Sequence, residues 1–474
     1  MKLIKNKKKR NIIFILCLFC MVISCSKTEK LSPETVVPTT LSTTNVKVPF
    51  SSKSEKYSKI NETTGLIVNQ NNFYRYITQA EAQLLQFGNK PMYRFGLRDA
   101  VTYDFNGDGR LDLFGFCTRF ELFPEVGDLG RAPGKFILIN DFYSGTKEYK
   151  VIDTDLCWIA GSFLLNDFNG DGKMEVAVFN SNGHQNVIYG INNPLIPVRI
   201  YSIDAGFNVT YKNVGNPLNM HSGTTGDIDN DGDIDIVQWP LNLGRGIEPV
   251  EFRYPYVLLN DGNGNFKVEN FLSDYTEFKS KFYDWSTSIY ELFDLNNDNK
   301  LDLIFGYNFG TVPKVVDPWN PSYDIVNKKI GILWGDGSGK FNSSNVTFLS
   351  LNSFQNLWLS LSGASFTDFD TDGDIDVLLA STTGPSKAYI LFLLENKGNK
   401  VFEDVTSKYL EGSSELDNTY YTHFYQPMFV DKDGDGDFDI VPNSSTAAWE
   451  SYKVISNLYW EKQGKNFIRR NLNN

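Results

Sequence analysis

Apolar residues recur at alternate positions in short runs along the chain, and six of these runs begin inside an acidic segment. The runs begin at residues 111, 174, 234, 301, 375 and 438, and in each the first and third residues are apolar, as Leu111 and Leu113 show. A period of two residues is typical of a strand whose side chains alternate between two faces. The pattern therefore predicts six strands, each of which follows an acidic loop.

A second pair of apolar runs, joined by a turn rich in Gly and Asn, follows most of the acidic segments. It begins some 25 to 35 residues further on, as at residues 256–268 and 389–402, and only the second segment lacks a clear copy. Such turns between alternating runs predict β-hairpins. Two hairpins in each unit supply four strands, which is the content of one propeller blade.

The six acidic segments, called loops 1 to 6, share a nine-residue pattern that repeats along the chain. They begin at residues 104, 167, 227, 294, 368 and 431, at intervals of 63, 60, 67, 74 and 63 residues. One supersecondary unit per period indicates a repeat architecture. We therefore expect an all-β chain that forms a β-propeller of four-stranded blades, six of them with an acidic loop. Residues 65–78 resemble the late hairpin of a further blade, which leaves a degenerate seventh blade open.

The positions of the nine-residue pattern differ in the side chains that they accept. Positions 1 and 5 are always Asp, position 3 is Asp or Asn, and position 9 is Asp except for Glu175. Position 7 is Arg, Lys or Asp, so we expect it to contribute its backbone carbonyl. Position 6 is Gly except for Asn299, and these two residue types readily take the left-handed conformation of a tight loop.

Oxygen ligands on a flexible loop favour Ca²⁺ before Mg²⁺, and no Cys or His joins the pattern to suit zinc. An EF-hand is excluded because position 12 is not acidic in any loop. The alternative is a solvated acidic turn that holds no ion. Up to six calcium ions are expected, one in each loop. The predicted ligands are Asp104, Asn106, Asp108, Arg110 and Asp112; Asp167, Asn169, Asp171, Lys173 and Glu175; Asp227, Asp229, Asp231, Asp233 and Asp235; Asp294, Asn296, Asp298, Lys300 and Asp302; Asp368, Asp370, Asp372, Asp374 and Asp376; and Asp431, Asp433, Asp435, Asp437 and Asp439.

These loops, with small residues such as Gly161 and Gly363 shortly before two of them, resemble the FG-GAP/VCBS repeat of integrin-α-like β-propellers. The resemblance covers roughly residues 64–474. It implies that positions 1, 3, 5 and 9 give side-chain ligands and that position 7 gives a carbonyl ligand. Glu175 and Asn299 depart from the family pattern, and the longer side chain of Glu175 implies weaker binding in loop 2.

The first 25 residues are expected to direct export rather than to fold. Residues 1–24 join a basic stretch to about 13 mostly apolar residues, too few to span a bilayer, as in a secretory signal peptide. Residues 22–25 resemble the lipobox of bacterial lipoproteins, which implies lipidation of Cys25, whereas the alternative is an uncleaved signal anchor. Residues 25–60 are expected to be a flexible tether and residues 61–474 the propeller. The protein would then be exported and held by lipid at the outer membrane or cell surface.

The charge of the chain agrees with bound cations and disfavours some partners. The formal net charge is −12, it becomes −18 without the six basic residues of the signal, and 24 acidic residues lie in the six loops. This charge excludes nucleic acid and anionic lipid as partners, so membrane contact is expected through the lipid anchor only. Cys117 and Cys157 remain in the mature chain, where they either form a disulfide or stay free and buried.

No catalytic signature such as a P-loop, GxSxG, HExxH or Rossmann glycine pattern occurs in the sequence. The first expectation is a cell-surface binding protein for a glycan or protein ligand, with calcium in a structural role. The alternatives are a polysaccharide lyase and a structural subunit of a surface assembly. The lyase is considered because some lyases that resemble this fold pair a His with a Tyr and neutralise uronate with Arg.

Residues six to ten places before each loop are expected to ring the propeller axis on the metal-free face. Aromatic rings there can stack on sugars, and Arg or His can orient a carboxylate. The alternative is that these aromatic residues pack between blades. The predicted ligand-binding residues are Arg98, Trp158, His221, Trp285, Trp358, Tyr421 and His423, with Phe95 beside Arg98.

Overall fold

The structure is a computed structural model in which part of the chain can be described. The predicted signal peptide, Cys25, the tether and residues 65–78 lie outside the described residues, as does Cys157. The described residues are 86–87, 90–91, 97–117, 135–141, 148–154, 156, 159–180, 194–218, 220–240, 255–273, 287–310, 330–353, 358–383, 389–415, 426–430, 435–443 and 458–471.

The described residues form six antiparallel four-stranded units in which each strand pairs with the next strand of the chain. This is the meander of a propeller blade, so the predicted all-β propeller fold is confirmed. Blade 1 contains β3 (Leu97–Tyr103), β4 (Asp112–Cys117), β5 (Lys135–Asn140) and β6 (Glu148–Asp153). Blade 2 contains β7 (Ile159–Asn166), β8 (Glu175–Asn180), β9 (Ile196–Ile203) and β10 (Val209–Leu218). Blade 3 contains β11 (Met220–Gly226), β12 (Asp235–Pro240), β13 (Tyr256–Asn260) and β14 (Phe266–Asn270). Blade 4 contains β15 (Thr287–Phe293), β16 (Asp302–Gly310), β17 (Gly331–Leu333) and β18 (Val346–Phe348). Blade 5 contains β19 (Trp358–Thr367), β20 (Asp376–Thr383), β21 (Tyr389–Asn396) and β22 (Phe402–Asp404). Blade 6 contains β24 (Gln426–Val430), β25 (Asp439–Asn443), β26 (Leu458–Gln463) and β27 (Asn466–Asn471).

Short elements add to this repeat. The strands β1 (Gln86–Phe87) and β2 (Lys90–Pro91) pair with each other before blade 1. The helix α5 (Thr406–Tyr409) and the strand β23 (Ser414–Glu415) follow blade 5, and β23 pairs with β21. The end of β16 also pairs with the start of β19, which joins blades 4 and 5 in one sheet.

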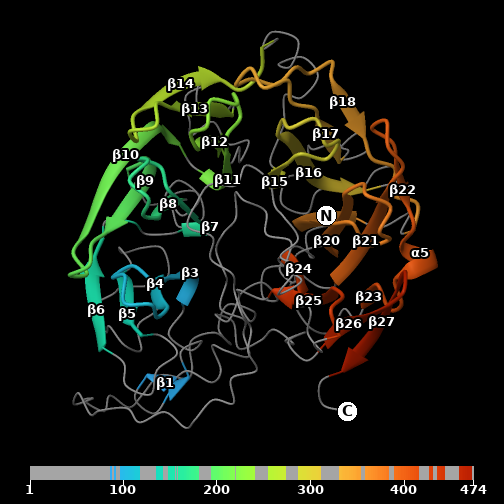
Figure 1. Ribbon diagram of the computed structural model, residues 1–474, viewed down its shortest axis with the longest axis horizontal. Helices are drawn as coiled ribbons and strands as arrows, with labels where there is room; N and C mark the ends of the chain where they lie inside the picture. The colour runs from blue at the N-terminus through green and yellow to red at the C-terminus, as the bar shows by residue number, and fades with distance from the viewer. Residues whose placement is uncertain are drawn as a thin grey trace, which may run out of the picture.

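The blades are arranged around a common centre (Figure 1). The first strand of each blade lies innermost, and contacts between these strands link β3, β7, β11, β15, β19 and β24 in chain order. The fourth strands lie on the outside of the ring; they are β6, β10, β14, β18, β22 and β27 (Figure 1). Each acidic loop therefore follows an innermost strand.

Blade 2 is more regular than its sequence indicates. Its late hairpin, β9 and β10, is fully formed around the turn at residues 204–208. This turn has one glycine, Gly206, and is closed by Asp204, whose carboxylate accepts hydrogen bonds from the backbone N–H groups of Gly206 and Asn208 at 2.8 and 2.9 Å. Asp261 closes the corresponding turn of blade 3 in the same way, with Gly262 and Gly264 in addition.

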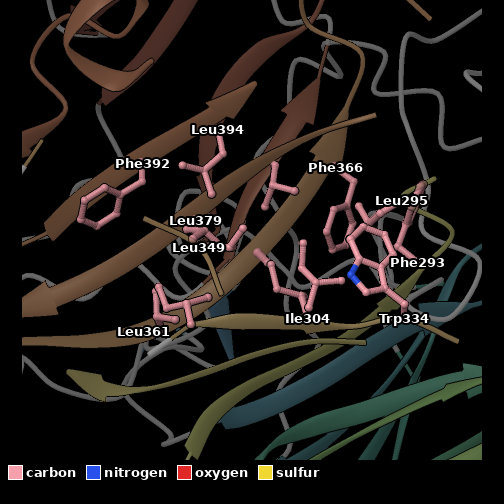
Figure 2. Close-up of a cluster of buried hydrophobic side chains, with 14 of the residues drawn as sticks. Phe293, Leu295, Ile304, Trp334, Leu349, Leu361, Phe366, Leu379, Phe392 and Leu394 are labelled. Carbon is pink, nitrogen blue, oxygen red and sulfur yellow. The ribbon is translucent and has the colours of Figure 1, made fainter. Parts of the chain in front are cut away.

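The hydrophobic core is divided among the seams between successive blades. Figure 2 shows the cluster between blades 4 and 5, where the rings of Phe293 and Phe366 stack with centroids 4.7 Å apart. Four further clusters fill the seams between blades 1 and 2, 2 and 3, 3 and 4, and 5 and 6. Successive residues of one strand face opposite seams. In β16, Leu303 packs against blade 3 and Ile304 packs against blade 5. Strands are therefore buried on both faces, as in β21, where the consecutive apolar residues 390–394 are all buried.

Close packing at one seam yields a prediction. A Cβ atom at Gly223 in β11 would lie 2.0 Å from Cε1 of the buried Phe179 ring in β8. We expect Gly223→Ala to lower the free energy of unfolding by about 1–3 kcal/mol, because a packed ring must move. The control is Gly206→Ala, whose Cβ would meet its nearest atom at 3.2 Å. Urea unfolding measures both variants, and equal stabilities would contradict this description of the seam.

Candidate metal-binding loops

The acidic loops join the first and second strands of their blades, as the sequence predicts. Loops 1 to 5 are described throughout, whereas Asp431 and Asp433 of loop 6 lie outside the described residues. Neighbouring loops touch: the Asn230 amide of loop 3 donates to the Asn299 carbonyl of loop 4 at 3.1 Å. The Asn297 amide of loop 4 donates to the Gly373 carbonyl of loop 5 at 3.4 Å. Loops 3 to 5 therefore form a continuous acidic surface on one face of the propeller.

The Asp at position 1 shapes loops 1 to 5 by accepting backbone hydrogen bonds. In loop 1, Asp104 Oδ1 accepts the N–H of Gly107 at 2.8 Å and Oδ2 accepts that of Gly109 at 2.7 Å. In loops 2, 3, 4 and 5, the Asp at position 1 likewise accepts the backbone N–H of position 6. Position 6 has a positive φ in every loop, including +65° at Asn299, which confirms the predicted left-handed turn.

Position 4 is a second left-handed position that the sequence analysis missed. Its φ is +76° at Gly107, +62° at Asn230 and +57° at Asn297. Thr371 takes the same conformation at +62°, which is unfavourable for a β-branched residue. The signal was present in the sequence, because position 4 is Gly or Asn in every loop except loop 5.

The Asp at position 9 is buried and fastens the loop to the third strand of its blade. Asp235 Oδ2 accepts the N–H of Ile228 at 2.9 Å, and Oδ1 accepts the N–H of Asn260, at the end of β13, at 2.8 Å. Asp112, Asp302 and Asp376 make the same pair of hydrogen bonds at 2.8 to 3.0 Å. Position 9 therefore has a structural role in addition to its predicted role as a ligand.

Glu175 departs from this arrangement, as its longer side chain suggests. Its Oε2 accepts the N–H of Phe168 at 2.9 Å, as in the other loops. Its Oε1 instead accepts the amide of Asn169, at position 3 of the same loop, at 2.8 Å. In loop 2 the Asn169 side chain at position 3 is therefore hydrogen-bonded to the carboxylate at position 9. Weaker calcium binding there stays a prediction.

The position-9 carboxylates carry a large electrostatic cost. Burial, with a smaller contribution from neighbouring carboxylates, raises the pKa of Asp235, Asp302 and Asp376 to about 8 each, although backbone N–H groups act to lower it. Burial likewise raises the pKa of Glu175 to about 8 and that of Asp112 to about 6. A proton or a cation must offset this cost near neutral pH.

The donor set fits a hard cation. Oxygen atoms of Asp227, Asp229 and Asp235, at positions 1, 3 and 9 of loop 3, lie within 4.8 Å of one another. Positions 1, 3 and 9 of loop 5 are grouped in the same way. Asp229 Oδ1 is buried and has no hydrogen-bond partner within the described part of the chain. Such clustered oxygens match the preference of Ca²⁺.

Positions 5 and 7 interact within the loop. In loop 3, Asp231 Oδ1 accepts the N–H of Asp233 at 3.0 Å, and all six loops contain this contact. The carbonyl of position 7 stays a predicted ligand. In loop 5, the buried Glu395 at the end of β21 also lies within 4.8 Å of Asp370 and Asp372. This residue lies outside the repeated pattern and was missed.

The predicted ligand-binding residues can be placed only in part. Arg98, His221 and Trp358 lie at the starts of the innermost strands β3, β11 and β19, at the ends remote from the acidic loops. Their side chains are outside the description, as are Trp158, Trp285, Tyr421 and His423 altogether. Among the described residues, no helix is long and apolar enough to cross a membrane.

Comparisons with known proteins address the repeat and the fold. The family model of the FG-GAP-like repeat matches residues 167–237 and 368–441, each beginning at the first Asp of an acidic loop. No curated protein matches the chain. Among solved structures, the Dos1 propeller is similar at a TM-score of 0.33 and 12% identity, over 76% of this chain and 81% of that chain. The rhamnogalacturonan lyase YesW is similar at 0.28 and 12%, over 78% and 59%. A rhamnogalacturonan lyase of Bacillus licheniformis is similar at 0.27 and 11%, over 76% and 60%.

The family match and the four-stranded meanders agree on the same repeat, in which an acidic loop follows the innermost strand of a blade. The chain is thus a β-propeller protein with FG-GAP-like repeats.

Proposed function

We propose that this chain is a calcium-stabilised binding protein that recognises a glycan or protein ligand outside the cell. The observation that carries the calcium part is the grouping of Asp227, Asp229 and Asp235, which are largely buried and repel one another when ionised unless a cation lies between them. The Asp and Asn side chains at positions 1, 3, 5 and 9 and the carbonyl at position 7 would hold each ion. Bound Ca²⁺ would supply the positive charge that these carboxylates lack.

The role of the ion is proposed to be structural, because the loops belong to the seams between blades. The amide of Asn260 in blade 3 donates to the carbonyl of Phe168 in loop 2 at 2.8 Å and to that of Ile234 in its own loop at 3.1 Å. Asn396 in blade 5 links loops 4 and 5 in the same way. An ion that fixes one loop would therefore also stabilise the contact with the neighbouring blade.

The binding site for the ligand is proposed on the face opposite the calcium loops. Arg98, His221 and Trp358 begin innermost strands at that end, so their side chains would surround the propeller axis. Rings and charged groups around an axis can stack on sugar faces and orient carboxylates. The proposed export fits the extracellular setting that FG-GAP-like repeats suggest, with Cys25 as the lipid anchor at the outer membrane or cell surface.

Removal of calcium should destabilise the protein, and more so at high pH. The raised pKa of Asp235, Asp302 and Asp376, about 8 against roughly 4 in an unfolded chain, means that the metal-free fold gains stability from their protons at low pH. That stability is lost as the pH rises through 8. In EDTA, the melting temperature should therefore fall between pH 5 and pH 9. Millimolar Ca²⁺ should raise it most at the alkaline end, because the ion binds the ionised form. Thermal melts that are unaffected by Ca²⁺ at every pH would refute the proposal.

Two neighbouring aspartates distinguish side-chain from carbonyl ligands. Asp231→Ala at position 5 should reduce the stabilisation by Ca²⁺ in loop 3, because a ligand is lost. Asp233→Ala at position 7 should preserve the stabilisation by Ca²⁺, because the backbone carbonyl remains. The side chain of Asp233 is a costly charge in the metal-free loop, since burial and the nearby Asp231 and Asp227 raise its pKa. Calcium titration followed by melting temperature compares the two. Equal losses would show that the ligand assignment is wrong.

The ligand face can be tested with an array of neutral and uronate-containing polysaccharides. We expect the wild-type protein to bind at least one of them, and Trp358→Ala to abolish binding with a change in unfolding free energy below about 1 kcal/mol. Tyr211→Ala is the control, because this aromatic side chain is 52% exposed on the outer strand β10. If Trp358→Ala instead costs roughly 3–5 kcal/mol, the residue is part of the core.

A further inference from the structure

Loops 3 and 5 form a matched pair within one chain. Both have Asp at positions 1, 3, 5, 7 and 9, Gly at position 6 and Ile at position 8. Both also group the carboxylates of positions 1, 3 and 9 within 4.8 Å. Any difference in their affinity for a cation must therefore come from the residues around them.

The two loops differ in what the following blade places beside position 3. In loop 5, Lys465 Nζ from the β26–β27 turn of blade 6 lies 2.7 Å from Asp370 Oδ2. The Asp370 side chain is 1% exposed, so this ammonium group is the charge that reaches it from the next blade. The turn consists of Gly464 and Lys465 only, and this short connection brings the lysine over the loop.

In loop 3 a glycine occupies the corresponding place. A Cβ atom at Gly339 of blade 4 would lie 3.2 Å from Cβ of Asp229, and Gly339 has a φ of +76°. A side chain there would be crowded and strained. Asp229 Oδ1 thus stays buried without a hydrogen-bond partner in the described structure.

Asp370 can bind a lysine through one carboxylate oxygen and a metal ion through the other. Its Oδ2 bonds Lys465, whereas its Oδ1 is buried and has no hydrogen-bond partner among the described residues. The other nearby acid, Glu395, has its own cation, because Lys397 Nζ lies 2.5 Å from its Oε1. Loop 5 is therefore more neutralised than loop 3.

We propose that Lys465 is a tethered cation that lowers the affinity of loop 5 for Ca²⁺ below that of loop 3 and holds blades 5 and 6 together when loop 5 has no ion. The inference rests on the proposed calcium function. Lys465 also restrains Asp370, which favours ion binding, but restraining one short side chain has a smaller effect than a positive charge beside a divalent ion. The repulsion therefore dominates.

Hydrogen exchange read by mass spectrometry resolves the two loops in one experiment on the full-length protein. Peptides that cover residues 227–235 and 368–376 report the calcium concentration at which each loop becomes protected. In the wild-type protein, the midpoint for loop 5 should be at least about tenfold higher than that for loop 3. In Lys465→Gln the midpoint for loop 5 should fall by about tenfold. In EDTA, loop 5 of Lys465→Gln should exchange faster than loop 5 of the wild-type protein.

Two variants serve as controls. Lys465→Arg keeps the charge and should retain the wild-type midpoint. Lys267→Gln removes a lysine of β14 whose side chain is 76% exposed and pairs with Glu269, so it should change neither loop. If the loop 5 midpoint is unchanged in Lys465→Gln while loop 3 still responds to calcium, the role of Lys465 is overturned but the proposed calcium function is not. Loss of calcium response from both loops of the wild-type protein would overturn the proposed function and this inference with it.

Discussion

The buried carboxylate at position 9 of each acidic loop is the group on which the blade depends. Asp235 accepts one N–H from its own loop and another from the end of β13, so it joins the first, second and third strands of blade 3. The same residue stands among other carboxylates in a poorly solvated place, where its charge is costly. A group that holds the blade together thus also carries a buried charge, which the neighbouring carboxylates repel.

The way in which this repulsion is offset determines how the blades are joined. The apolar clusters fill the seams between blades, while the acidic loops and the Asn side chains at the third strands link one blade to the next at a single face. Under the proposed function, a calcium ion would neutralise a loop and thereby stabilise a seam. At loop 5 the chain already places a lysine on the carboxylate of Asp370, so that one seam contains a cation of its own.

Much of this fold could be predicted because its signals are local. Apolar alternation and the nine-residue period identify the strands and the loops, and the glycines at position 6 identify a left-handed turn. What escaped prediction depends on residues distant in sequence or on an alternative local chemistry. The Asn260 backbone N–H that donates to Asp235 lies 25 residues away, and Lys465 lies 95 residues from Asp370. The hairpin of blade 2, whose turn is closed by the side chain of Asp204, was also missed.

We propose above that a divalent cation offsets the grouped carboxylates of the acidic loops. The most direct test is a count of calcium ions bound to the folded protein by native mass spectrometry, before and after treatment with EDTA. We expect several ions per chain, up to one for each of the six loops, all of which EDTA removes. A folded chain that binds no calcium at millimolar concentration would contradict it.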